Sequence, residues 1–206
     1  MRVRRAGDAA VLAEVEDLAT AHRLHAAVRA AGFEGIVDVV PGERTVLVVT
    51  DPARCDLDRL RARLAALELP ERPEGDAAPL EIPVRYDGED VAEVAELTGL
   101  TAEEVVRRHA SGDYVVAYLG FSPGFGYLTG LDPALHVPRR STPRTSVPAG
   151  SVAIAGPYSA VYPSPSPGGW RLLGRTDVAL WDLDRPSPAL LRPGARVRFV
   201  PVEDAR

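Results

Sequence analysis

The chain has 206 residues, 46% of them hydrophobic, which is enough for one large domain or two small ones with a real core. Its 29 acidic residues outnumber its 24 basic residues, and the net charge of −5 argues against nucleic acid as the main partner, because phosphate binding needs a net basic face. All the basic side chains are arginines, so no lysine can serve as a phosphate clamp, Schiff base or general base.

The remaining composition predicts a cytoplasmic protein. The lone Cys55 cannot form an internal disulfide, which fits a reducing compartment. The basic start of the chain is not followed by the apolar segment of a signal peptide, because Asp8, Glu14 and Glu16 interrupt it. The long uncharged runs later in the chain are too rich in glycine and proline to be membrane helices.

Residues 1–72 predict a small N-terminal α+β domain. Gly32 follows a run with helical periodicity and is expected to end that helix. Asp51 and Pro52 are interpreted as the N-cap and first position of a second helix, whose apolar stripe is formed by leucines. The expected elements are strands at residues 2–6, 11–15, 36–40 and 45–49, a helix at residues 18–31, and a second helix with Leu57, Leu60, Leu64 and Leu67 on its apolar face.

Residues 80–206 predict a second, β-rich domain, joined to the first by a charged, proline-rich linker at residues 68–79. Two short helices are expected near its start, one ended by Gly99 and the next begun by a capping box of Thr101 and Glu104. Short apolar runs then alternate with Gly/Pro turns, which indicates a closed or sandwiched β domain. Its strands are expected at residues 80–86, 114–119, 152–155, 160–162, 170–173, 178–181 and 196–200.

Two familiar catalytic motifs are excluded. Residues 120–124 match the G-x-S-x-G pattern of serine hydrolases, whose oxyanion hole uses the backbone N–H after the serine. Here that position is Pro123, which has no N–H, so a catalytic Ser122 is not expected. A phosphate-binding P-loop requires a lysine, which the chain lacks.

The positions of the histidines and the single cysteine do not indicate a metal site. His22 and His25 lie three residues apart on the first helix, but two ligands make a poor metal site and a solvated helix face is the simpler interpretation. His109 ends the second capped helix, where a favourable contact with the helix C-terminus is expected. Cys55 is interpreted as a small residue near a helix start.

Two rigid loops are the best candidates for ligand binding. Residues 138–145 hold Arg139, Arg140 and Arg144 between prolines, and guanidinium forks match carboxylate and phosphate geometry; a solvated basic loop is the alternative. Residues 164–170 form a second loop that is rich in proline and glycine. There the Gly-Gly pair lets a ligand approach the backbone and the final tryptophan can stack on a ligand or plug a barrel end.

The same loops carry a family resemblance. The segments GFSPGFGYL at residues 120–128, PRRSTPR at residues 138–144 and SPGGW at residues 166–170 resemble motifs of the allophanate hydrolase subunit 1 family, which includes KipI. Order and spacing hold over about 100 residues, and the segments VPAGSV and GRT between and after them continue the match. The resemblance implies a cyclophilin-like β-barrel after the N-terminal α+β domain.

The resemblance also implies a role as the B subunit of an ATP-dependent 5-oxoprolinase, which cleaves 5-oxo-L-proline to L-glutamate. The A and C subunits of that enzyme would be its partners, and the complex would bind ATP at a site that the sequence does not place on this chain. The alternatives are a KipI-like inhibitor of a sensor histidine kinase, an allophanate hydrolase subunit 1-like amidohydrolase component and, from the implied fold alone, a peptidyl-prolyl isomerase.

The expected substrate site combines the two loops, without a catalytic residue or a metal ligand set. Arg139 and Arg144 are expected to bind an anion. Ser166, Gly168 and Gly169 are expected to orient the substrate through hydroxyl and amide groups. The residues expected to wall or complete the pocket are Pro123, Gly124, Phe125, Tyr127, Trp170 and Arg175.

Overall fold

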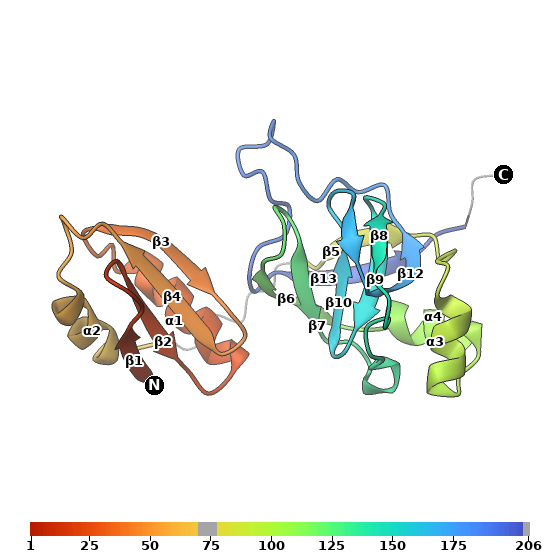
Figure 1. Ribbon diagram of the computed structural model, residues 1–206, viewed down its shortest axis with the longest axis horizontal. Helices are drawn as coiled ribbons and strands as arrows, with labels where there is room; N and C mark the ends of the chain where they lie inside the picture. Colours follow the sequence, from red (N-terminus) through yellow and green to blue (C-terminus); the bar gives the residue numbers. More distant parts are fainter. Residues whose placement is uncertain (70–77, 204–206) are drawn as a thin grey trace. The chain divides into compact units, whose positions relative to one another are not determined.

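The protein has an α+β fold, as expected from the sequence. The computed structural model describes residues 1–69 and 78–203, which fall into two compact units, Met1–Asp76 and Ala77–Arg206 (Figure 1). The predicted linker at residues 68–79 lies largely outside the described residues, so the domain limits 1–72 and 80–206 stay predictions. No helix in the described part of the chain is long and apolar enough to cross a membrane.

The N-terminal unit is a four-stranded antiparallel sheet with two helices packed on it (Figure 1). Alternating valines and alanines of the central strands face Leu24 and Val28 of the first helix and Leu60 and Leu64 of the second, and these buried side chains form one core. In spatial order the strands are β1 (Arg2–Arg5), β2 (Ala10–Glu14), β4 (Thr45–Thr50) and β3 (Ile36–Pro41); the helices are α1 (Leu18–Ala30) and α2 (Leu57–Ala65).

The start predicted for α2 is wrong. The helix begins at Leu57, because the carboxylate of Asp56 accepts hydrogen bonds from the backbone N–H groups of the next turn, at 2.8 and 3.0 Å. Asp51 instead accepts from the N–H of Ala53 at 3.0 Å and stabilises a turn. Cys55 lies just before this cap, partly buried against the core, as predicted.

The second unit is built on a seven-stranded sheet that curls into a nearly closed barrel. Its edge strands approach where Arg85 and Arg175 exchange backbone hydrogen bonds of 2.9 and 2.8 Å. This approach needs Gly174, since a Cβ there would lie 2.1 Å from the carbonyl oxygen of Arg85. In order, the strands are β12 (Arg171–Arg175), β9 (Ser151–Ala155), β10 (Tyr158–Val161), β7 (Gly126–Thr129), β6 (Tyr114–Leu119), β13 (Arg196–Pro201) and β5 (Leu80–Val84).

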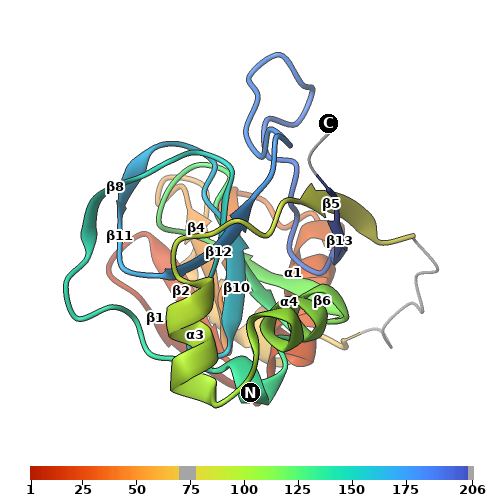
Figure 2. The ribbon, with the colours of Figure 1, turned by 90° about the vertical axis from the view of Figure 1, so that its right-hand side faces the viewer.

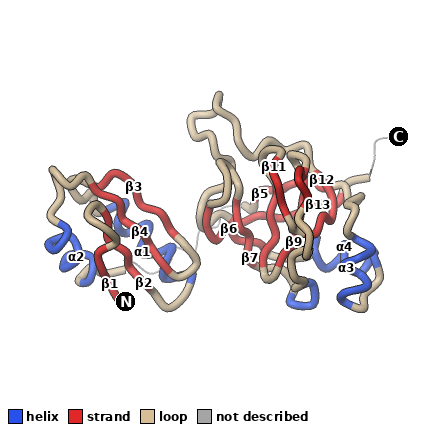
Figure 3. The backbone as a smooth tube through the Cα atoms, in the orientation of Figure 1, coloured by secondary structure: helices blue, strands red, loops and turns tan. Residues whose placement is uncertain are grey.

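Two short helices, α3 (Val91–Thr98) and α4 (Ala102–Ala110), lie together beside the barrel (Figure 3). The first ends at Gly99, which has a φ of 69°. The second is capped by Thr101, whose hydroxyl accepts from the N–H of Glu104, which confirms one half of the predicted capping box. The carboxylate of Glu104 accepts from Arg107 and Arg108 instead of completing the box. A short 3₁₀ helix, η1 (Pro133–Leu135), packs near both helices.

The strand content differs from the prediction in one strand that is absent and three that were missed. Residues 178–181 lie in the long loop between β12 and β13 rather than in a strand (Figure 3). The sequence also missed β7 and a separate two-stranded sheet of β8 (Arg144–Val147) and β11 (Ser166–Gly168), which lie side by side (Figure 2). These short strands contain glycine, proline and polar residues, so hydrophobic periodicity does not mark them.

Candidate functional site

An aromatic pocket of about 220 Å³ lies at the two loops that the sequence singled out. Three segments contribute to its wall. They are residues 121–127, which lead into β7, the arginine loop at residues 138–145, which leads into β8, and β11 with the residues that follow it. The lining residues are Phe121, Phe125, Tyr127, Arg139, Pro143, Tyr162, Pro167, Gly168, Gly169 and Trp170.

The pocket wall is a set of aromatic rings held at fixed angles. Phe125 is at its centre, with edge-to-face contacts to Tyr127 at 5.2 Å, Tyr162 at 5.4 Å and Trp170 at 5.6 Å between ring centroids. Phe121 also packs edge-on to Phe125, at 5.2 Å, yet 60% of its surface stays exposed. Such mutually braced rings give the pocket a preformed apolar shape.

Arg139 supplies the charge of the pocket. Its guanidinium carbon lies 5.9 Å from the centre of the Trp170 ring, within range of a cation–π contact. Of the described residues that line the pocket, Arg139 alone has a charged side chain. The pocket therefore offers flat apolar walls together with one cationic group.

Gly168 is required by close packing at the pocket, whereas a Cβ at Gly169 would meet its nearest atom, the carbonyl oxygen of Arg140, at an ordinary 3.6 Å. A Cβ at Gly168 would lie 2.3 Å from the hydroxyl oxygen of Tyr162, so only glycine fits between β11 and this ring. Burial raises the pKa of Tyr162, which therefore stays a neutral phenol at physiological pH. Ser166 precedes the pair in β11, and its buried hydroxyl has no hydrogen-bond partner among the described residues.

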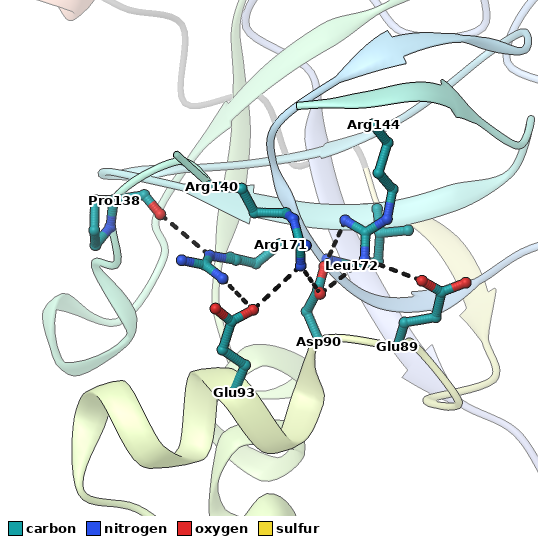
Figure 4. A network of polar contacts seen from close by, with 8 residues as sticks. All are labelled: Glu89, Asp90, Glu93, Pro138, Arg140, Arg144, Arg171 and Leu172. Carbon is teal, nitrogen blue, oxygen red and sulfur yellow. Dashed lines mark hydrogen bonds and ion pairs between the residues drawn. The ribbon is translucent and has the colours of Figure 1, made fainter. Parts of the chain in front are cut away.

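Arg140 and Arg144 of the same loop face a buried carboxylate instead of the pocket (Figure 4). The side chain of Asp90 is 3% exposed. Its Oδ1 accepts from Arg140 Nη1 at 2.7 Å and from Arg144 Nη2 at 2.8 Å. Its Oδ2 accepts from Arg144 Nη1 at 2.9 Å and from the backbone N–H of Leu172 at 2.7 Å.

These contacts decide the charge state of Asp90. Burial alone would raise its pKa, but the hydrogen bonds from Arg144 and from the backbone N–H of Leu172, with the nearby positive charges, lower it below its usual range. Glu93 extends the network, because it pairs with Arg140 at 3.3 Å and with Arg171 (Figure 4). The result is a partly buried cluster of alternating charges beside the pocket.

The structure divides the predicted site residues into two groups. Six of them line the pocket, namely Phe125, Tyr127, Arg139, Gly168, Gly169 and Trp170. The others are not among its lining residues: Arg144 binds Asp90, Arg175 pairs with Asp87 at 2.7 Å, and Gly124 packs against Trp181. Pro123 belongs to the same turn as Gly124, and Ser166 stands at the start of β11.

Sequence reasoning missed Phe121, Pro143, Tyr162 and Pro167 as lining residues. Phe121 has a φ of 67°, which is unusual for a residue with a side chain, and such strain often marks functional positions. Phe121, Pro143 and Pro167 stand within the three motif segments, so their position was a usable signal. Tyr162 lies outside these segments, and its ring contacts to Phe121 and Phe125 are long-range and could not be deduced from spacing.

The expectation for His109 is wrong. Its ring is fully buried in the barrel core, where Nδ1 lies 2.8 Å from the Tyr86 hydroxyl and Nε2 lies 2.8 Å from the Ser159 hydroxyl. Burial lowers its pKa to about 3, so the ring is neutral and cannot act as a charge at the helix end. No group of three or more residues that could hold a metal ion occurs in the part of the chain that the structure describes.

The chain is similar to bacterial enzyme subunits over most of its length. Residues 1–191 match the family described as carboxyltransferase domain, subdomain C and D. The protein of Escherichia coli O157:H7 that is named as the B subunit of 5-oxoprolinase is 43% identical, with 96% of this chain and 94% of that protein covered. The Bacillus subtilis protein of the same name is 38% identical, with 89% and 82% covered.

Two solved structures are similar to this chain over nearly its whole length. TTHA0988 superposes with a TM-score of 0.85 at 42% identity, over 99% of this chain but 41% of that one, so this chain spans less than half of that protein. PH0987 from Pyrococcus horikoshii gives a TM-score of 0.60 at 35% identity, with 98% of both chains covered. The chain therefore belongs to the family of the carboxyltransferase domain, subdomain C and D, and shares most of its length with proteins named as the B subunit of 5-oxoprolinase.

Proposed function

We propose that this protein is the B subunit of an ATP-dependent 5-oxoprolinase that opens 5-oxo-L-proline to L-glutamate in the cytoplasm. The observation that carries the proposal is the similarity to the Escherichia coli protein of that name, at 43% identity over 94% of its length. The A and C subunits of the enzyme are the proposed partners, since the name of the relatives implies further chains in the complex.

The aromatic pocket suits the proposed substrate. 5-Oxoproline is a flat five-membered lactam with one carboxylate, and a pocket of about 220 Å³ has room for it. Rings such as Phe125 and Trp170 would cover the faces of the lactam, while the Arg139 guanidinium would bind its carboxylate through paired hydrogen bonds. The Gly168–Gly169 backbone is proposed to orient the substrate, since both residues line the pocket, whereas the Ser166 hydroxyl is buried outside the lining.

ATP is proposed to bind to the assembled complex. Opening a stable lactam requires activation of its ring carbonyl, which ATP hydrolysis can drive. This chain has no lysine and therefore no P-loop. We therefore propose that the groups that bind the ATP phosphates lie at the interface with a partner or on the partner itself. The chain alone is accordingly expected to be inactive.

An omission assay tests the proposal. The purified chain and the A and C subunits are mixed in all combinations, and ATP hydrolysis is followed with and without 5-oxoproline. We expect 5-oxoproline-dependent hydrolysis only when all three are present. Replacing 5-oxoproline by allophanate tests the amidohydrolase alternative, and adding the chain to an autophosphorylating sensor kinase tests the KipI-like alternative. Turnover that does not depend on this chain would contradict the proposal.

A further inference from the structure

We propose that Asp90 is a positioning residue for the aromatic pocket: its buried carboxylate ties the loop that carries Arg139 to the strand that follows Trp170. The inference deepens the proposed function, because it assigns to Asp90 the placement of the two pocket residues that would bind the carboxylate and the ring of 5-oxoproline.

Asp90 contacts both the loop that carries Arg139 and the strand that follows Trp170. Arg140 and Arg144, which belong to the same loop as Arg139, donate three hydrogen bonds of 2.7 to 2.9 Å to its carboxylate. Leu172, two residues after Trp170, donates its backbone N–H to the same carboxylate at 2.7 Å and accepts the Asp90 N–H at 3.1 Å. One side chain thus joins two segments about 30 residues apart in the sequence.

Arg140 passes this restraint to its neighbour. Its side chain points to Asp90, while its backbone N–H donates to the carbonyl oxygen of Gly169 at 2.8 Å. The preceding Arg139 is left to face Trp170, where its guanidinium carbon lies 5.9 Å from the ring centre. Because Arg139 itself is exposed, its position depends on the restraints on its neighbour.

The use that Asp90 makes of its carboxylate is unusual for its place in the chain. It occupies the N-cap position of α3, where an aspartate ordinarily accepts hydrogen bonds from the N–H groups of the first turn. Here its side chain makes no capping bond, and both oxygens are given to the arginines and Leu172. A side chain that gives up local capping bonds for long-range contacts is typical of functional sites.

Hydrogen–deuterium exchange tests the restraint without any ligand. Asp90→Asn keeps the shape of the side chain but places amide hydrogens against the Arg140 and Arg144 donors. We expect backbone amides of residues 139–147 to exchange at least about tenfold faster, while β9 and β10 keep the protection of the wild-type protein. Unchanged exchange in the loop, or equally faster exchange throughout the barrel, would overturn the proposal.

Kinetics of the assembled complex tests the consequence for the site. Asp90→Asn is expected to raise KM for 5-oxoproline by about 10- to 100-fold, since misplacing a binding group by about 1 Å can cost that much. Asp132→Asn is the matched control, because Asp132 also pairs with an arginine, Arg108, at 2.8 Å, but this pair does not include the loop that carries Arg139 or β12; its KM should stay at the wild-type value. A wild-type KM in Asp90→Asn would overturn the positioning role.

The two assays also separate this inference from the proposed function. A wild-type complex without 5-oxoproline-dependent turnover would contradict the proposed function. The hydrogen–deuterium exchange of the loop in Asp90→Asn would still show whether Asp90 restrains the loop. If the amide substitution prevents folding, Asp90→Glu keeps the charge and shifts the carboxylate by one methylene. It should change loop exchange and KM in the same direction, and wild-type values for both would again overturn the proposal.

Discussion

Arg139 and Arg144 lie five residues apart in one loop and have different surroundings. Arg139 is exposed beside the Trp170 ring, and no ion pair involves it within the described ranges. Arg144 is 17% exposed and donates to both Asp90 and Glu89. We therefore propose Arg139 for ligand binding and Arg144 for holding the loop, although both were expected to bind an anion.

Lysine substitutions separate these two roles, because lysine keeps the charge but loses the planar fork. Arg139→Lys should lower kcat/KM of the assembled complex by about tenfold or more, which corresponds to roughly 1.5–3 kcal/mol for a charge-assisted contact, with little change in Tm. Arg144→Lys should lower the free energy of unfolding by about 1–3 kcal/mol, because it removes a hydrogen bond to a buried carboxylate. If Arg139→Lys and Arg144→Lys lost the same activity and showed the same change in Tm, this division of roles would be contradicted.

Buried His109 predicts a pH dependence of stability. Its folded pKa of about 3 lies below its ordinary value of 6.5, so the unfolded chain binds the extra proton between these two pH values. This contribution to stability is present above pH 6.5 and is lost as pH falls, by up to about 1.4 kcal/mol per pH unit.

Urea unfolding of wild type and His109→Gln at pH 7 and pH 5 checks this pH dependence. The variant is destabilised at both pH values, but the drop between them should be smaller than in the wild type, because glutamine does not titrate. An identical drop in both proteins would show that His109 is not the titrating group.

The pocket residues that the sequence predicted are those whose role is local. The Pro-Gly-Gly-Trp run itself indicates a rigid loop with close backbone packing, and Gly168 and Trp170 have these roles in the structure. The partner of the arginines could not be predicted in this way, because Asp90 precedes Arg140 by 50 residues. Tyr162 was expected only as the last residue of a strand at residues 160–162, and only the folded barrel places its ring in the pocket wall.

At the scale of elements, the barrel depends on the approach of β12 to the segment after β5. A Cβ at Gly174 would meet a backbone oxygen at 2.1 Å, and backbone cannot move aside as a side chain can. Gly174→Ala should therefore lower the free energy of unfolding by about 3 kcal/mol or more, at the upper end of overpacking effects. Urea unfolding measures the difference.

Gly120→Ala is the control for this prediction. Its Cβ would meet the nearest atom, on the Tyr127 ring, at an ordinary 3.6 Å, and Gly120 has no positive φ. Its free energy of unfolding should differ from the wild type by less than about 1 kcal/mol. Similar losses in both variants would mean that the approach of the two barrel edges does not account for the effect.

Elements were predictable where one apolar run makes one strand. The strand predicted at residues 114–119 is β6, because its valines and tyrosines fit a half-buried pleated strand. β8 and β11 pair with each other outside the main sheet, with a register shift, so neither shows a clear alternation. Residues 178–181 are apolar enough for a strand, yet only Trp181 makes a β-bridge, to Ala189 within the same loop.

At the scale of the whole molecule, related sequences occur both alone and inside longer chains. This chain covers 94% of the Escherichia coli relative but 41% of TTHA0988. A fold that is continuous with further polypeptide in some relatives is expected to work in contact with other chains in the rest. The proposed 5-oxoprolinase activity is therefore expected to depend on partner chains.

Titration of this chain into fixed amounts of the A and C subunits measures that dependence most directly. Glutamate formed from 5-oxoproline and ATP hydrolysed are followed together. We expect that glutamate formation is absent without the chain, rises with its concentration until the partners are saturated, and stays coupled to ATP hydrolysis throughout. Glutamate formation at the full rate without the chain, or none at a saturating amount of it, would contradict the assignment of this chain to the 5-oxoprolinase complex.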